Sequence, residues 1–270
     1  MVGALLASKD LSLTWSAAVE EAVGQFYTDN VVVAVLGTLR GGPRRPRDLE
    51  PLTHRRSASV TRIVDRLEDH GDVRRHTGGA DDDHRAVLVR ITPRGRRAVD
   101  DVAATVVDQV DEVKAPIGIA LDHLGTLVPP SSPPSNRPRS PVEVCVTLAH
   151  LGIVIADLVA ASLEGLDVSA TLVLCLLAED PRGRPSVLSD RLGMTSGGMT
   201  KLLDRLESQG LVVRNYGRLQ IDRRAVEVTL TPAGAAQLGR TLTELESHAA
   251  EMLVAYSNVQ DHLTQLKTAS

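Results

Sequence analysis

The sequence predicts a mainly α-helical chain with small β-hairpin wings, built as two similar units. The segment TRIVDRLEDHGDVRRHTGGADDDHRAVLVRITPRG, at 61–95, is followed 139 positions later by TKLLDRLESQGLVVRNYGRLQIDRRAVEVTLTPAG, at 200–234. A Pro- and Ser-rich stretch, PPSSPPSNRPRSP, separates halves of nearly equal length. A repeat period this long indicates a duplicated domain and not a solenoid of short units.

We therefore expect a first repeat at 1–128, a linker at 129–141 and a second repeat at 142–270. A length of 270 residues fits two domains of ordinary size. The prolines of the linker cannot continue a helix, so this segment should form an extended spacer. With 43% hydrophobic but only 2% aromatic residues, the cores must be aliphatic.

Both repeats show the same order of predicted elements. Apolar residues at helical spacing predict an amphipathic helix that ends at Gly71 in one copy and at Gly210 in the other. Alternating apolar residues then predict two short strands, which form a hairpin. A threonine cap followed by proline begins a further helix at 92–93 and at 231–232. Together with two upstream helices, this order predicts a duplicated winged helix-turn-helix with a helical, dimerisation-type body.

We expect this body to be shared between the copies and to contain segments 11–27, 99–127, 142–163 and 235–266. The segment at 142–163 is apolar and long enough to suggest a membrane span, but polar groups at Glu143, His150 and Asp157 would be costly inside a bilayer. It should instead be the most buried helix of the body.

The wing region carries the pattern D-x-R-x-x-x-V-x-[LI]-T-x-x-G in both copies. The residues that match it are Asp83, Arg85, Val87, Val89, Ile91, Thr92 and Gly95, and then Asp222, Arg224, Val226, Val228, Leu230, Thr231 and Gly234. In the second copy the wing pattern is preceded by a segment close to the usual helix-turn-recognition-helix of the family named below, LSDRLGMTSGGMTKLLDRLESQGLV. On these motifs each copy resembles the multiple antibiotic resistance regulator (MarR) family, over nearly the whole chain apart from the linker.

This resemblance implies a dimeric transcription regulator. Its recognition helices would enter two major grooves and its wing arginines would reach minor grooves. Many members of the family are released from DNA by small amphipathic or phenolic ligands, or by oxidation. No cofactor is implied.

The candidate DNA-binding residues lie on the two predicted recognition helices and wings. Hydroxyls and a cation near a helix N-terminus suit phosphates and base edges, and an arginine on a wing can enter a narrow minor groove. The alternatives are an ordinary solvated helix face and, for the wing arginines, an Asp–Arg clamp within the hairpin. The candidates are Ser57, Ser59, Thr61, Arg62 and Arg85 in the first copy, and Ser196, Gly197, Thr200, Lys201, Arg223 and Arg224 in the second.

The net charge of −4 does not exclude DNA, because the distribution of charge decides the matter. The first predicted reading head has a cluster of basic residues, whereas much of the acid lies in terminal helices such as DDVAATVVDQVDE. Within the recognition helices, four charged residues lie deeper and are interpreted as a structural set. The basic cluster is Arg40, Arg44, Arg45, Arg47, Arg55, Arg56 and Arg62, and the structural set is Asp65, Arg66, Asp204 and Arg205.

The two copies are not equal. In the first, Pro51 interrupts the short helix, Asp72 stands where the second has Leu211, and the wing carries aspartates at 81–83. A metal site that combines these aspartates with His76 and His84 is an alternative, but a solvated acidic turn explains them equally well, and no metal is assigned. The second copy is therefore expected to be the stronger reader of DNA.

No catalytic pattern competes with this interpretation, and no enzyme activity is expected. The chain shows no phosphate-binding glycine loop, nucleophile elbow or HExxH motif. Cys145 and Cys175 lie in apolar runs, which indicates core residues and not a redox sensor or a disulfide. No secretion signal opens the chain, so a cytoplasmic location is expected.

The predicted function is that of a DNA-binding transcriptional regulator, expected to be a repressor. Its two copies would form a pseudo-dimer that reads a palindromic operator in double-stranded DNA, and further oligomerisation stays open. A phenolic or lipophilic effector would bind in an apolar pocket between the body and each head. The alternative is a ligand-sensing or protein-binding winged-helix module, antirepressor-like, that has lost DNA binding.

Overall fold

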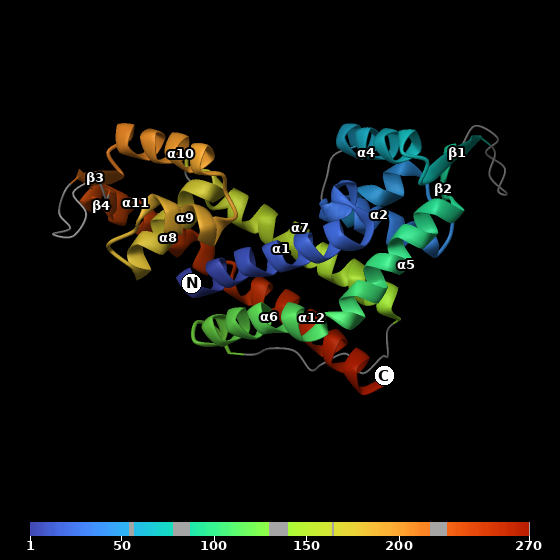
Figure 1. The fold of residues 1–270 in the computed structure, drawn as a ribbon. Coiled ribbons are helices and arrows are strands. Elements are labelled where there is room, and N and C mark those ends of the chain that lie inside the picture. The colour runs from blue at the N-terminus through green and yellow to red at the C-terminus, as the bar shows by residue number, and fades with distance from the viewer. Residues whose placement is uncertain (54–56, 78–86, 130–139, 164, 217–225, 270) are drawn as a thin grey trace.

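The computed structural model describes residues 1–53, 57–77, 87–129, 140–163, 165–216 and 226–269. Within these ranges the chain is mainly α-helical and contains two antiparallel hairpins. Two heads, each with a hairpin, lie at opposite ends of a central helical body (Figure 1). The fold is thus the expected duplicated winged helix-turn-helix.

The two halves share the same order of main elements, and the first has in addition the 3₁₀ helix η1 and a short helix divided into η2 and α3. The first contains α1 (Val2–Val23), η1 (Gln25–Thr28), α2 (Asn30–Arg40), η2 (Pro46–Leu49), α3 (Glu50–Thr53), α4 (Ser57–Asp69), β1 (Val73–Thr77), β2 (Val87–Ile91), α5 (Pro93–Asp108) and α6 (Val110–Gly125). The second contains α7 (Pro141–Ala161), α8 (Val168–Glu179), α9 (Pro185–Leu192), α10 (Ser196–Ser208), β3 (Val212–Tyr216), β4 (Val226–Leu230), α11 (Pro232–Glu246) and α12 (Ala249–Ala269). We call α2 to β2 the first head and α8 to β4 the second head.

The local signals that end and begin helices act as expected. Gly71 and Gly210 have φ values of 83° and 70°, a left-handed region that favours glycine, and they follow α4 and α10. Thr92 caps α5 by accepting a hydrogen bond from the N–H of Gly95, and Thr231 caps α11 in the same way. The short helix of the first head is divided, with the 3₁₀ segment η2 followed by the four-residue α3 that contains Pro51.

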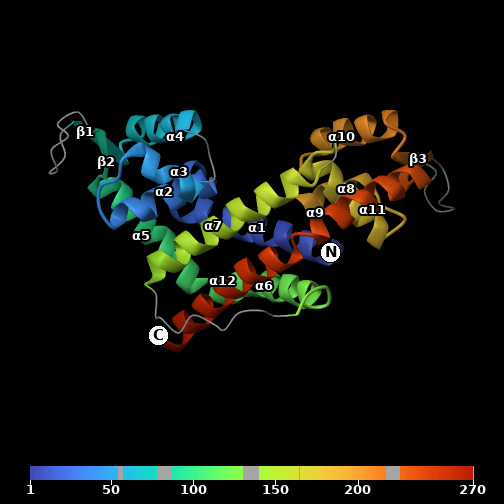
Figure 2. The ribbon, with the colours of Figure 1, turned by 180° about the vertical axis from the view of Figure 1, so that it is seen from behind.

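The centre of the molecule is a helical body, in which α6 packs against α1 and α12, and α12 also packs against α7. The heads attach to it through helices of the other half, because α2 packs on α7 and α8 contacts α1. The N-terminal end of α1 consequently lies beside the second head, as Figures 1 and 2 show from opposite sides. The two halves are therefore interlocked.

Two expectations about the body need correction. A single long helix was expected after each Thr-Pro pair, but the helices break at Gln109 and near Ser247, which lets α6 and α12 turn back into the body. The helix α7 does not stand out as the most buried helix of the body, because α12 buries as many residues and several apolar residues of α7 line a cavity.

Among the described residues α7 alone is long and apolar enough to cross a membrane by length and composition. In the most apolar stretch of α7, 44% of the residues are buried inside the protein. It packs against α2, α5 and α12, so apolar side chains of other helices cover part of its surface.

The glycine that follows each threonine cap is required by a close backbone approach. A Cβ added to Gly234 would lie 2.0 Å from the carbonyl oxygen of Leu211. We expect Gly234→Ala to destabilise the protein by about 1–3 kcal/mol, because the strand and the helix must move apart. Gly239 lies in the same helix with open space around it, so Gly239→Ala should stabilise by up to about 1 kcal/mol. Urea denaturation of both variants measures this, and equal effects would contradict it.

Candidate nucleic-acid interface

The two recognition helices, α4 and α10, lie along the same face of the molecule, with the hairpins at the outer ends (Figure 1). Each buries one apolar side. The buried residues are Val60, Ile63, Val64 and Leu67 on α4, and Met199, Leu202, Leu203 and Leu206 on α10. The opposite sides face solvent. This places two equivalent helix surfaces where one extended partner can contact both.

The structure exposes most of the predicted residues on these helices. On α4, Thr61 and Arg62 are exposed and Ser59 is half-buried, and Ser57 begins the helix. On α10 the exposed positions are Ser196, Gly197, Thr200 and Lys201. A Cβ added to Gly197 would meet no atom within 4 Å, so its surface is open to a close approach. Exposed N–H groups and hydroxyls at a helix N-terminus suit an anion such as phosphate.

The hairpin tips fall outside the described residues. The predicted DNA contacts of Arg85, Arg223 and Arg224 therefore stay predictions. The wing aspartates at 81–83, His84 and the basic pair at 55–56 also lie outside the described residues.

The strands of the first wing carry a basic pair that sequence reasoning missed. Arg74 and Arg90 are directly opposite in the β1–β2 register and both are exposed. Like charges in this position repel, and neither has an ion-pair partner among the described residues. The equivalent pair on the second wing is Val213 and Thr229. A polyanion would relieve the repulsion at the first wing. The signal for this pair is that both arginines lie on the same face of the hairpin once the two strands are paired.

Each recognition helix is tied to its wing by an arginine of the first strand. Nη2 of Arg75 lies 2.6 Å from Oδ1 of Asp65, and Nη1 lies 2.6 Å from Oε2 of Glu68. In the second head, Nη1 of Arg214 lies 2.6 Å from Asp204 and 2.9 Å from Glu207. We call these two sets the arginine clamps.

The clamps also include backbone hydrogen bonds. The backbone N–H of Arg75 donates to Glu68 and is the main cause that lowers the pKa of this carboxyl group. The guanidinium of Arg214 further donates to the carbonyl oxygen of Thr200 at 3.1 Å. Asp65 and Asp204 are therefore engaged within the protein, as the structural interpretation of the sequence expected.

The next arginine along each recognition helix reaches the head's first helix. Arg66 forms an ion pair with Asp29, whose side chain caps α2. Arg205 forms an ion pair with Asp167, which caps α8. The caps orient the helix starts, and the arginines link them to α4 and α10. This pairing is the second part of the predicted structural charge set.

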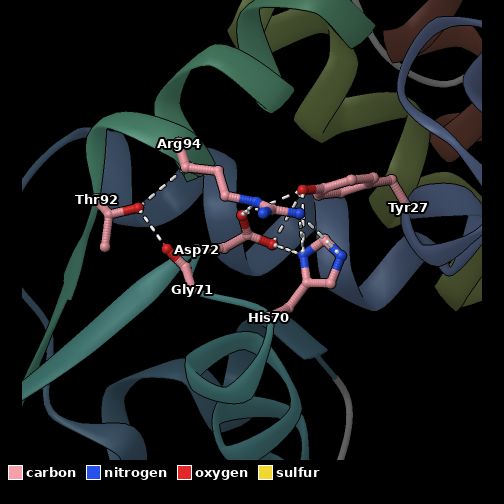
Figure 3. Close-up of polar contacts among 7 residues, drawn as sticks. Tyr27, His70, Gly71, Asp72, Thr92 and Arg94 are labelled. Carbon is pink, nitrogen blue, oxygen red and sulfur yellow. Dashed lines mark hydrogen bonds and ion pairs between the residues drawn. The ribbon is translucent and has the colours of Figure 1, made fainter.

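The first head contains a buried polar cluster around Asp72 (Figure 3). The Asp72 carboxylate is fully buried and lies 3.1 Å from the hydroxyl of Tyr27, 2.8 Å from Nδ1 of His70 and 3.3 Å from Nε of Arg94. Nη2 of Arg94 also lies against the His70 ring, 3.1 Å from Nε2 and 3.3 Å from Nδ1. Burial, followed by the charge of Asp72, raises the pKa of Tyr27.

The second head has no equivalent of this cluster. Its residues at the corresponding positions are Leu166, Gln209, Leu211 and Ala233. The sequence showed the exchange of Asp72 for Leu211, but Tyr27 and Arg94 are distant along the chain and became visible as partners only in the folded structure. The cluster joins η1, the end of α4, the start of β1 and the start of α5.

An apolar cavity of about 410 Å³ lies beside the second head. Its walls come from α1, α7, α8, the turn between α9 and α10, Tyr256 of α12, and Asn30 at the start of α2 in the first head. The volume falls within the range of small-molecule sites. A pocket between body and head was expected, and this one meets the expectation for the second head.

The two cysteines are core residues, as expected from the sequence. Cys145 and Cys175 are buried, and burial raises the pKa of each thiol to about 12, so both stay protonated. Within the described ranges no group of three His, Cys, Asp or Glu side chains could hold a metal ion.

Comparisons with known proteins give structural neighbours for part of the chain. No family model and no curated protein matches it. The YusO protein from Bacillus subtilis is 23% identical, with 40% of this chain and 77% of that one covered, at a TM-score of 0.35. A MepR-like protein complexed with pseudoligands is 26% identical, with 37% and 74% covered, at 0.32. A probable transcriptional regulator from Pseudomonas aeruginosa is 25% identical, with 40% and 80% covered, at 0.36.

We expect Asp72→Asn to lower the free energy of unfolding by about 1–3 kcal/mol, because Arg94 and His70 lose a charged partner in a buried place. In the double variant Asp72→Asn, Arg94→Ala the losses should be less than additive, since both act on one interaction. Asp69→Asn, at the exposed last residue of α4, is the control and should change stability by less than about 0.5 kcal/mol. Additive losses in guanidinium denaturation would show that Asp72 and Arg94 do not interact.

Proposed function

We propose that the chain is a MarR-like transcriptional regulator that binds double-stranded DNA through both heads. The observation that carries this proposal is the presence of two recognition helices on one face, each with an exposed N-terminal surface of hydroxyls and a cation. A helix of this kind fits the major groove, and a hairpin beside it can reach the adjacent backbone or minor groove. Arg74 and Arg90 of the first wing have no ion-pair partner among the described residues, which supports a phosphate contact.

The interlocked body supports a pseudo-dimer within one chain. Paired winged helices bind half-sites related by a two-fold axis, so the operator should be palindromic, with half-sites about one helical turn apart. We expect the regulator to act as a repressor that a small amphipathic ligand releases. The apolar cavity beside the second head supports the ligand.

The cation of α10 provides a direct test. We expect Lys201→Ala to weaken binding to a palindromic duplex by roughly tenfold, about 1.4 kcal/mol, and to reduce the slope of log affinity against log salt by about one. Lys114→Ala is the matched control, because Lys114 lies on α6, which is on the side of the body away from α4 and α10 in Figure 1. Fluorescence anisotropy at several salt concentrations measures both variants.

If Lys201→Ala and Lys114→Ala bind DNA equally well, α10 does not contact the phosphates. If the unmodified chain binds no duplex, including its own upstream DNA, the chain is the antirepressor-like alternative.

The pseudo-dimer is tested by the stoichiometry of the complex. One chain should occupy one palindrome, because both heads and the shared body belong to the same polypeptide. Light scattering of the isolated complex gives its mass. A mass that corresponds to two chains per palindrome would mean that each chain uses one head.

A further inference from the structure

The two faces of the first hairpin carry different side chains. Side chains alternate between the faces of a strand, so the register of β1 and β2 places Arg75 and Val89 on one face and Arg74 and Arg90 on the other. The face with Val89 is turned toward the head, because Val89 is buried and Arg75 reaches two carboxylates of α4. Arg74 and Arg90 therefore lie on the face turned away from the recognition helix, which we call the outer face of the wing.

The two arginines of this outer face are close together and are not neutralised. Residues directly opposite each other in an antiparallel pair have Cβ atoms about 4.5–5.5 Å apart. Arg74 and Arg90 are both exposed, and no carboxylate within the described ranges forms an ion pair with either. His76 follows on the same face, opposite Leu88. The free protein thus keeps two like charges side by side, an arrangement that a bound anion stabilises.

The outer face of the second wing lacks these charges. The register of β3 and β4 places Val213 opposite Thr229, at the positions of the two arginines. The next pair on this face is Asn215 and Glu227, and Nδ2 of Asn215 donates a hydrogen bond to Oγ1 of Thr229 at 3.2 Å. A carboxylate on this face repels phosphate. The two wings therefore share a backbone but offer an anion very different outer faces.

The place of the hairpins in the molecule decides which anion can reach them. The hairpins lie at the outer ends of the surface that carries α4 and α10, so a duplex bound along this surface continues past each wing (Figure 1). A straight duplex does not reach the outer face of the first wing, because this face is turned away from α4. A duplex that curves around the end of the molecule brings its phosphates onto this face, and the new contacts offset the cost of the bend.

We propose that the DNA flanking the half-site of the first head bends onto the outer face of the first wing, where Arg74 and Arg90 bind its phosphates. The DNA flanking the other half-site stays unbent. Only one flank of the operator is then held by the protein, although both heads bind the core. The inference rests on the proposed function for the presence of DNA. It assigns the larger electrostatic contact to the first head, although the sequence favoured the second copy as the stronger reader.

Duplexes of three lengths test the one-sided contact. The core is a palindrome that the full chain selects from random DNA, extended by about ten base pairs, one helical turn, at neither end, one end or both ends. One flank should strengthen binding roughly tenfold and raise the slope of log affinity against log salt by about two, one for each arginine. The second flank should add at most about twofold, the statistical gain from two equivalent orientations on a palindrome.

Two results of this titration would overturn the proposal. If each flank strengthens binding by the same large factor, both wings hold DNA. If neither flank changes the affinity, the arginines contact no flanking phosphate, and an acidic protein surface becomes the better partner for them.

Exchange of the residues between the two outer faces provides matched variants. In Arg74→Val, Arg90→Thr the first wing receives the residues of the second, so the gain from the flank should disappear while binding to the bare core stays unchanged. The converse exchange, Val213→Arg, Thr229→Arg, should make the second flank as effective as the first. The first exchange removes a like-charge pair, so its melting temperature should not fall and lost binding does not reflect unfolding. Equal loss on the bare core and on the flanked duplex would place the arginines within the half-site and contradict the proposal.

Energy transfer between fluorophores at the two ends of the one-flank duplex measures the bend. At saturating protein, transfer should be more efficient with the unmodified chain than with Arg74→Val, Arg90→Thr. Equal efficiency would show that these arginines do not bend the flank. If the unmodified chain binds no duplex of any length, the proposed function fails and this inference fails with it, whereas binding that ignores the flanks overturns this inference alone.

Discussion

The orientation of each recognition helix depends on one arginine of the neighbouring strand. Arg75 and Arg214 each bind two carboxylates of the helix, and their side chains are only 27% and 11% exposed. Partial burial strengthens such charge-assisted hydrogen bonds, because water competes less for the charged groups. The wing and the recognition helix thereby become one unit, and Arg66 and Arg205 link this unit to the cap of the head's first helix. The exposed surface of α4 or α10 is therefore held in a fixed orientation.

Joining the two copies in one polypeptide permits them to differ. In a dimer of identical chains every substitution appears on both sides of the axis, whereas here each copy can be changed alone. The polar cluster around Asp72 belongs to the first head, and the second head has leucine in place of Asp72. At the first head α2 packs closely on α7 at Gly37 and Gly152, whereas α8 contacts α1 less extensively at the second. The two heads share a fold but differ in how closely they pack on the body.

The fold could be predicted from the sequence because its signals are local. Glycine at the helix ends, Thr-Pro at the helix starts and periodic apolar residues each act within a few positions, and Gly71, Gly210, Thr92 and Thr231 have the expected roles. The breaks near Gln109 and Ser247, the partners of Asp72 and the cavity depend on segments far apart in the sequence. The spacing of apolar residues along the sequence does not reveal contacts of this kind. The exposed recognition-helix residues were found by pattern, whereas Arg74 and Arg90 required the strand register.

The interlocking of the halves has a consequence for synthesis on the ribosome. The helix α2 packs on α7, so the surface around Gly37 stays uncovered until residues 141–161 have been made and have left the exit tunnel. Likewise α1, the first helix to emerge, has to wait for α8 of the second half. The first half therefore leaves the ribosome with apolar surface exposed, and this surface is prone to aggregation until the second half has been made.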